Sequence, residues 1–182
     1  MPDDCFISSA QVLDPLTGTL SGPIDITVTA GRIAAVTPAG TSAPPPAVRR
    51  VEARGRLLLP GLVNAHTHSP LNLLKGTGDV LSHPAFMWTN QADTSGRTPD
   101  EVRLVALLGC IEHLLSGTTA IVDHFPEQGF SADHVAAVVD AYDQAGLRAM
   151  VALRIFDEPY DDIAPPGGLP DALAADNPLT PP

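Results

Sequence analysis

Three short apolar runs separated by two helical patterns constrain this sequence more than any other feature. The runs are GLVNAHTH at 61–68, TTAIVDHF at 118–125 and LRAMVALRIF at 147–156. The first helical pattern begins at a capping box, Thr98 to Glu101, with proline at the first helical position. Ser131 caps the second pattern and Gly146 ends it. This alternation of strands and capped helices predicts an α/β fold with a parallel sheet.

The rest of the chain divides into segments of different composition. Residues 1–58 contain short β-rich runs broken by turn signals, with a hairpin predicted at Ala30-Gly31. They predict a small unit of the β-sandwich type. Residues 59–156 hold the three predicted strands and two helices, with a long irregular segment from Ser69 to about Arg97. Residues 157–182 are rich in proline and acidic side chains, and they predict a loop or tail.

The charge and the cysteines limit the classes of partner and compartment. The formal net charge is -11 at pH 7. Such a surface repels phosphate backbones, so nucleic-acid binding is not expected. No apolar run reaches the length of a membrane span, and the N-terminus lacks the pattern of a signal peptide, so membrane association is not expected. Cys5 and Cys110 form no CxxC pattern, so neither a disulfide framework nor a cysteine zinc site is indicated. Without a signal peptide or a membrane span, a reducing cytoplasm is the expected compartment.

His66 and His68 stand one residue apart at the end of the first apolar run. Side chains two residues apart in a strand point to the same side, so both imidazoles can approach one ion. The carboxyl end of a parallel strand is where such folds place their active sites, and neutral imidazole is a favoured ligand of zinc and iron. A His-x-His pair also occurs by chance on exposed strands, and a catalytic zinc normally has three protein ligands. The pair alone is therefore compatible both with metal binding and with two exposed histidines that have no ligand.

A longer motif surrounds the histidine pair. Pro60-Gly61 opens the strand, and Leu73-Leu74-Lys75-Gly76 follows the pair. CIEHLLSGTTAIVDH, at 110–124, leads into the second strand. Together these motifs resemble the amidohydrolase superfamily, in particular the branch that holds chlorohydrolases and deaminases of S-adenosylhomocysteine, guanine or cytosine. The resemblance extends from about residue 5 to about residue 160.

The resemblance implies a (β/α)8 barrel that carries a small β-sandwich built from both chain ends. It implies one divalent metal ion, zinc or iron, with His66 and His68 as ligands from the first strand and further ligands from strands five, six and eight. The implied reaction is hydrolysis or deamination of a carbon–nitrogen bond, other than a peptide bond, in a cyclic amidine or nitrogen heterocycle. A metal-activated water is the implied nucleophile, and the partner is a small-molecule substrate.

The chain is short for the fold that it resembles. A (β/α)8 barrel takes about 250 residues, and residues 59–182 suffice for about three strands and two helices, so the barrel is expected to be incomplete. The resemblance places the proton-transfer groups on later strands, and no catalytic residue is assigned in this chain. We therefore expect a truncated N-terminal portion that is inactive alone. The alternatives are one half of a split enzyme, completed by a second chain or a homo-oligomer, and a non-catalytic subunit.

Three further residues are candidates for substrate binding. His124 ends the second strand, and Arg154, near the end of the third, is a candidate anchor for a carbonyl or carboxylate. Trp88 lies in the segment after the first strand, where relatives build part of the substrate pocket. Each residue has a structural alternative. His124 can be a packed or loop histidine, Arg154 can form a salt bridge to a nearby carboxylate, and Trp88 can be a hydrophobic side chain buried under the loop. Asn64 points the same way as His66, and a hydrogen-bonding role suits it better than metal ligation.

Overall fold

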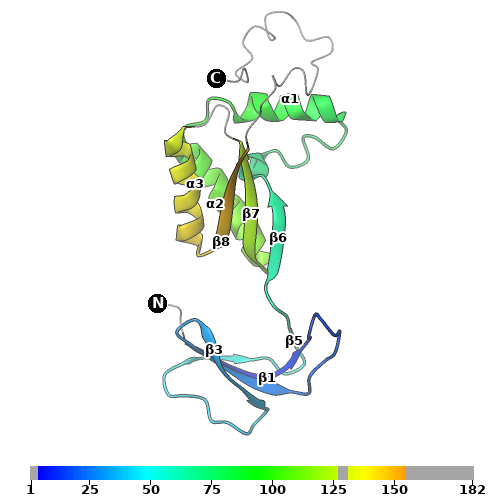
Figure 1. Cartoon of the computed structure of the whole chain (residues 1–182), viewed down its shortest axis with the longest axis vertical. Helices are drawn as coiled ribbons and strands as arrows, with labels where there is room; N and C mark the ends of the chain where they lie inside the picture. Colours follow the sequence, from blue (N-terminus) through cyan, green and yellow to red (C-terminus); the bar gives the residue numbers. More distant parts are fainter. Residues whose placement is uncertain (1–3, 127–130, 155–182) are drawn as a thin grey trace, which may run out of the picture. The chain divides into compact units, whose positions relative to one another are not determined.

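A computed structural model describes residues 4–126 and 131–154, and the predicted tail at 157–182 lies outside them. The chain divides into two compact units, Met1–Pro60 and Gly61–Pro182 (Figure 1). Each unit has its own sheet. The candidate metal ligands lie in the second unit.

The first unit is built on a five-stranded sheet. Its strands are β1 Cys5–Val12, β2 Ile24–Thr29, β3 Arg32–Pro38, β4 Arg49–Glu52 and β5 Leu57–Leu58. The strand order is β3-β2-β1-β4, and β5 also pairs with β1. Ala30 and Gly31 both have positive φ and close the hairpin between β2 and β3, as the sequence predicts. The second layer of the predicted sandwich is not found among residues 4–60, and the composite sandwich stays a prediction.

The second unit contains three parallel strands in the order β6-β7-β8. They are β6 Leu62–Thr67, β7 Thr118–Pro126 and β8 Arg148–Arg154. The helices α2 Pro99–Leu115 and α3 Ala132–Ala145 connect them. Each helix returns the chain to the same end of the sheet, which makes the strands parallel. The alternation of strands and helices predicted from the sequence is confirmed.

Both connecting helices begin at caps that satisfy free N–H groups. In α2, the Thr98 hydroxyl accepts a hydrogen bond from the Glu101 N–H at 3.3 Å, and the Glu101 carboxylate accepts the Thr98 N–H at 2.7 Å. In α3, the Ser131 N–H donates to Nδ1 of His134 at 3.0 Å. The imidazole thereby takes the place of the glutamate in a usual capping box. Gly146 ends α3 with a φ of 69°, a left-handed conformation that favours glycine.

The helices α2 and α3 pack against β7 and form the core of the unit. The buried apolar side chains of this core are Val102, Ala106, Cys110, Ile121, Phe125, Val138, Ala141, Tyr142 and Leu147. Ile121 and Phe125 are four positions apart on β7, so their side chains point to the same face of the sheet. That face is therefore the one covered by helices.

The opposite face of the sheet, called the open face, includes the apolar residues Val63, Ala120, Val122 and Met150. The register pairs Val63 with Ala120 and Met150 with Val122, which places all four side chains on one side. Val63 is 69% exposed and Met150 is 65% exposed. Apolar side chains are thus left in contact with solvent on this face of the described unit.

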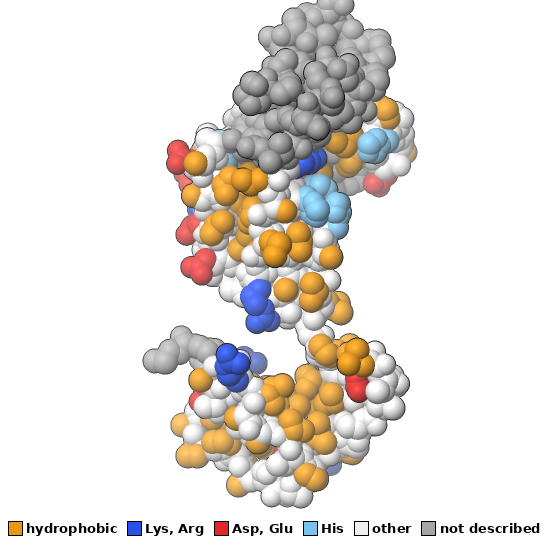
Figure 2. All heavy atoms as spheres, viewed as in Figure 1, with side chains coloured by type: hydrophobic (Ala, Val, Ile, Leu, Met, Phe, Trp, Pro, Cys, Tyr) orange, Lys and Arg blue, Asp and Glu red, His pale blue; other side chains and the backbone are white. Residues whose placement is uncertain are grey.

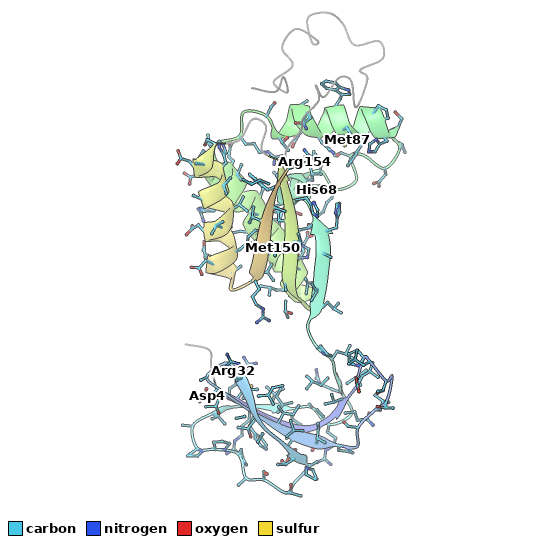
Figure 3. The ribbon with its side chains drawn as sticks, viewed as in Figure 1. Asp4, Arg32, His68, Met87, Met150 and Arg154 are labelled. Carbon is cyan, nitrogen blue, oxygen red and sulfur yellow. The ribbon has the colours of Figure 1, made fainter. Side chains whose placement is uncertain are left out.

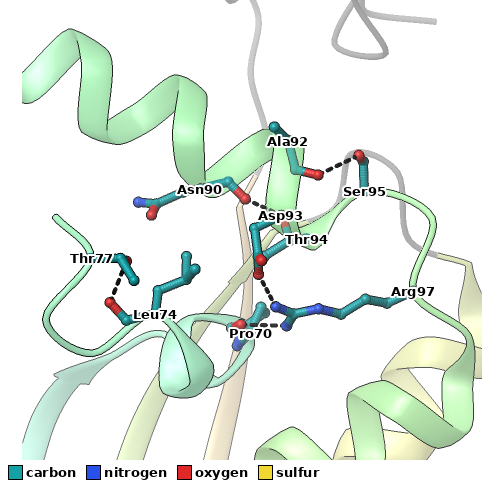
Figure 4. Close-up of polar contacts among 9 residues, drawn as sticks. All are labelled: Pro70, Leu74, Thr77, Asn90, Ala92, Asp93, Thr94, Ser95 and Arg97. Carbon is teal, nitrogen blue, oxygen red and sulfur yellow. Dashed lines mark hydrogen bonds and ion pairs between the residues drawn. The ribbon is translucent and has the colours of Figure 1, made fainter.

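The segment 69–97 was expected to be irregular, and this expectation is wrong. It contains a short 3-10 helix, η1 Ser69–Leu73, and a further helix, α1 His83–Thr94. α1 contains several weak helix formers, and its large apolar residues form one run, Phe86 to Trp88, instead of a stripe along the helix. Tertiary contacts stabilise it instead, because Arg97 donates to the Pro70 carbonyl at 2.6 Å and pairs with a carboxylate in the last turn of α1 (Figure 4).

The described part of the second unit therefore has three α-helices, where two were predicted. The missed helix lies between η1 and α2 in the chain. None of the helices in residues 4–126 and 131–154 is long and apolar enough to cross a membrane.

Candidate metal centre

The carboxyl ends of the three parallel strands gather the predicted polar side chains. His66 lies near the end of β6, and His68 follows it directly. His124 lies near the end of β7, and Arg154 ends β8. Figure 3 shows His68 and Arg154 at the same end of the sheet, beside α1. Ligands of parallel α/β folds bind at this edge.

The two imidazoles of the His-x-His motif converge. Nε2 of His66 lies 3.1 Å from Nε2 of His68, and the ring centroids are 4.8 Å apart. Two nitrogen ligands of a tetrahedral zinc ion lie about 2.0–2.1 Å from the metal and hence about 3.3 Å from each other. The observed separation is therefore close to that of two ligands of one ion.

The main chain of β7 orients His68. Nδ1 of His68 lies 2.9 Å from the carbonyl oxygen of His124. A carbonyl oxygen only accepts, so Nδ1 carries the proton and Nε2 has the free lone pair. Burial lowers the pKa of His68, which favours the neutral imidazole that binds metal ions. The contact with β7 thus sets both the tautomer and the direction of the ring.

A β-bulge lies beside His66. Asn64 pairs with Ile121 and Thr67 with Asp123, so three steps along β6 match two along β7. Such a bulge interrupts the ladder and re-aims a side chain. The Asn64 carboxamide oxygen accepts a hydrogen bond from the His66 N–H at 3.1 Å. Asn64 therefore has a hydrogen-bonding role at the bulge, as predicted.

Asp123 is a buried carboxylate that sequence reasoning did not single out. It is 0% exposed and accepts hydrogen bonds from the Ser69 N–H at 2.9 Å, the Ser69 hydroxyl at 2.6 Å and the Tyr142 hydroxyl at 2.6 Å. Ser69 follows His68 in the chain, so these bonds hold the turn directly after a candidate ligand. The signal in the sequence is the acidic residue inside the apolar run TTAIVDHF.

Tyr142 connects this network to α3. Burial and the charge of the nearby Asp123 raise the pKa of Tyr142 well above its ordinary value. The hydroxyl therefore stays protonated and donates to Asp123. The core of the unit thus reaches from α3 to the turn after β6.

A cavity of about 190 Å³ lies beside His68. Side chains of η1 and α1 form most of its wall, among them Phe86 and Met87. Arg154 lines the same cavity, which brings a candidate ligand and a candidate substrate anchor to one space. Trp88 is half-buried on α1 and is not among the described residues that line the cavity. Its role in substrate binding stays a prediction.

His124 adjoins the histidine pair. Its ring centroid lies 4.3 Å from that of His66 and 5.7 Å from that of His68. Figure 2 shows a group of histidine side chains exposed on the surface of this unit, near hydrophobic side chains. The position agrees with a group that meets a ligand at the strand ends, and substrate contact by this ring stays a prediction.

The described residues supply two candidate metal ligands and not a complete set. No group of three or more His, Cys, Asp or Glu side chains in residues 4–126 and 131–154 could hold a metal ion. The separation of the two Nε2 atoms and the tautomer of His68 nevertheless fit a divalent ion. The pair therefore fits two ligands of one ion, and metal binding by it stays a prediction.

Parallel strands, connecting helices and polar groups at the carboxyl ends of the strands place the second unit in the α/β class whose ligands bind at that edge. The model of the Amidohydrolase family matches residues 57–167. The chain belongs to this family, as the motif around the histidine pair predicts.

Curated relatives with enzyme names are longer than this chain. A 5-methylthioadenosine/S-adenosylhomocysteine deaminase of Haloarcula marismortui is 32% identical over 174 residues, which are 93% of this chain and 37% of the relative. A 5'-deoxyadenosine deaminase of Methanothermobacter thermautotrophicus is 36% identical over 159 residues, 85% of this chain and 34% of the relative. The chain thus spans about a third of the length of these relatives.

Solved structures share the fold. Atrazine chlorohydrolase from Arthrobacter aurescens, complexed with zinc, has a TM-score of 0.71 at 23% identity, covering 82% of this chain and 35% of that chain. N-isopropylammelide isopropylaminohydrolase from Burkholderia multivorans has a TM-score of 0.61 at 21% identity, covering 96% of this chain and 43% of that chain. At these identities the likeness shows the fold alone.

Proposed function

We propose that this chain is part of a metal-dependent amidohydrolase. The reaction is hydrolysis or deamination of a carbon–nitrogen bond, other than a peptide bond, in a cyclic amidine or nitrogen heterocycle. One observation carries the proposal: Nε2 of His66 and Nε2 of His68 lie 3.1 Å apart, and the His124 carbonyl holds Nδ1 of His68. The activity belongs to the whole enzyme, because the chain spans about a third of its relatives.

His66 and His68 would hold one divalent ion, zinc or iron, through their Nε2 atoms. Such an ion lowers the pKa of a water ligand and supplies a nucleophile at neutral pH. Further ligands and the proton-transfer groups are expected outside the described residues, because a catalytic zinc normally has at least three protein ligands. This chain supplies the rigid part of the site, since β7 orients His68 before a ligand binds.

The cavity beside His68 supports the choice of substrate. Its wall is mainly apolar, and Arg154 adds a cationic group that can bind a carbonyl or carboxylate. The names of the two curated relatives refer to deamination of adenosine derivatives. A small nitrogen heterocycle therefore suits the cavity, with His124 and Trp88 as further candidate contacts.

Zinc binding by the 182-residue chain tests the metal proposal. We expect calorimetric titration to give about one zinc ion per chain, with at least tenfold weaker binding in His66→Ala. His113→Ala is the matched control, because His113 lies on α2, away from the strand ends, and should leave zinc binding unchanged. Equal zinc affinity in His66→Ala and His113→Ala would exclude the pair as the metal site.

A size measurement during the same titration addresses the alternative of a split enzyme. If zinc binds only to an associated species, a second copy or chain completes the site. If zinc binds to the monomer, the pair holds the ion with water as the remaining ligands.

A further inference from the structure

Asn90 on α1 contains a buried polar atom without a partner. The residue is 6% exposed, and its Oδ1 has no hydrogen-bond partner among residues 4–126 and 131–154. Its main-chain carbonyl accepts a hydrogen bond from the Thr94 hydroxyl at 2.7 Å, while the carboxamide extends away from that bond (Figure 4). A buried acceptor without a donor destabilises the folded state. An orphaned atom of this kind therefore calls for a group that completes it.

The surroundings of Asn90 indicate what that group is. Asn90 lines the same cavity of about 190 Å³ as His68 and Arg154. An engineered cavity of about 150 Å³ holds benzene in another protein, so this one has room for a planar ring. Phe86 and Met87 contribute an aromatic ring and a thioether to the cavity wall, and both groups pack well against planar rings. The cationic Arg154 in the wall favours a ring without positive charge.

We propose that the Asn90 carboxamide recognises the exocyclic amino group of an uncharged, planar nitrogen heterocycle bound in this cavity. Oδ1 accepts an N–H of the amino group, and Nδ2 can donate to the adjacent ring nitrogen, as a carboxamide does with the edge of adenine. A ring that lacks the amino group leaves Oδ1 buried without a donor, so it binds less tightly. The inference rests on the proposed function, because it names the substrate class of the same site.

The test compares 9-methyladenine with 9-methylpurine, which differ only in the amino group. We expect the full 182-residue chain to bind 9-methyladenine about tenfold more tightly in a calorimetric or NMR titration. In a ¹⁵N-labelled chain the side-chain NH₂ resonances of Asn90 should shift with 9-methyladenine and much less with 9-methylpurine. Equal affinities, or no binding of either compound, would overturn the proposal.

Asn90→Leu removes the carboxamide at similar volume. We expect the preference for 9-methyladenine to disappear and Tm to rise by about 2–4 °C, because an unsatisfied buried oxygen is gone. If Asn90 only supported the fold, Tm would fall instead. Thr89→Ala, at an exposed position of α1, is the matched control and should keep the tenfold preference. If Asn90→Leu still preferred 9-methyladenine over 9-methylpurine, the proposed role of Asn90 would be refuted. If this variant does not fold, the comparison of the two compounds on the wild-type chain decides the question.

His66→Ala separates this inference from the metal proposal. His66 is not among the described residues that line the cavity, so this variant should lose zinc and keep the preference for 9-methyladenine. If the wild-type chain binds zinc but does not prefer 9-methyladenine, only the proposed role of Asn90 is refuted. If the wild-type chain prefers 9-methyladenine but does not bind zinc, only the metal proposal is refuted.

Discussion

His68 is held by β7 at two adjacent residues. The His124 carbonyl accepts its Nδ1–H, and the Asp123 carboxylate binds Ser69, the next residue in the chain. The ring therefore has its direction in the free protein, so little rotamer entropy is lost when a ligand binds. Because Asp123 also binds the Tyr142 hydroxyl, the candidate site is connected to the core of the unit.

Asp123→Asn tests this connection. The substitution replaces the charged acceptor by a neutral carboxamide, so the hydrogen bond from the Ser69 N–H loses its charge assistance and the Ser69 and Tyr142 hydroxyls must turn from donating to accepting. We expect the free energy of unfolding, measured with urea, to fall by about 2–4 kcal/mol. Zinc affinity should fall about tenfold as the turn after His68 loosens.

Tyr142→Phe is the matched control for that variant. It removes one of the three hydrogen bonds and leaves those to Ser69, so we expect a loss of about 1–1.5 kcal/mol and little change in zinc affinity. If Asp123→Asn were no more destabilising than Tyr142→Phe, the bonds to Ser69 would contribute nothing to stability.

At the scale of the elements, η1 and α2 approach closely at Gly109. A Cβ built on Gly109 would lie 2.1 Å from Nδ2 of Asn72, the side chain that donates to the Val105 carbonyl at 3.3 Å. Glycine at this place lets η1 lie against the helix. The packing of η1, which begins at Ser69, thus depends on the absence of one side chain on α2.

Gly109→Ala is expected to lower the stability of the protein, although this substitution inside a helix usually raises it. Glycine to alanine inside a helix usually stabilises by about 0.5–1 kcal/mol. Here we expect a loss of about 1 kcal/mol, because the Asn72 side chain must move and gives up its hydrogen bond. In an Asn72→Ala background the same substitution should stabilise the protein. Urea unfolding of the four proteins measures this coupling, and an unchanged sign in both backgrounds would show that Asn72 does not exclude the Cβ.

At the scale of the whole molecule, the open face leaves Val63 and Met150 in solvent. An apolar sheet face of this kind is buried in most folded proteins, and its burial is favourable by about 25 cal/mol per Å². We therefore expect the isolated chain to associate through this face.

Sedimentation velocity over a range of concentrations checks this expectation. Val63→Thr combined with Met150→Gln should weaken association about tenfold, because both side chains become polar. Val139→Thr is the control, since Val139 is 51% exposed on α3 and does not belong to the open face. Equal association of the two variants would mean that chains meet through another surface.

Local sequence patterns predict the three parallel strands, the two capped helices, the histidine pair and the membership of the amidohydrolase family. These signals are local: a capping box spans four residues, and a His-x-His pair takes its shared direction from the strand repeat. The helix α1 was missed because several of its residues are weak helix formers. The contact between Arg97 and the Pro70 carbonyl that stabilises it joins residues 27 apart in the chain.

The contacts that hold the site join segments that lie far apart in the chain. Ser69 and Asp123 are 54 residues apart, and His68 and the His124 carbonyl are 56 apart. No local pattern records such a contact, because it depends on the register between β6 and β7 and on the bulge beside His66. The Asn90 Oδ1 atom, which has no donor among the described residues, likewise became visible only when α1 was placed beside the cavity. The sequence therefore shows which chemical groups the chain carries, and the packing of its helices and strands determines which of these groups come into contact.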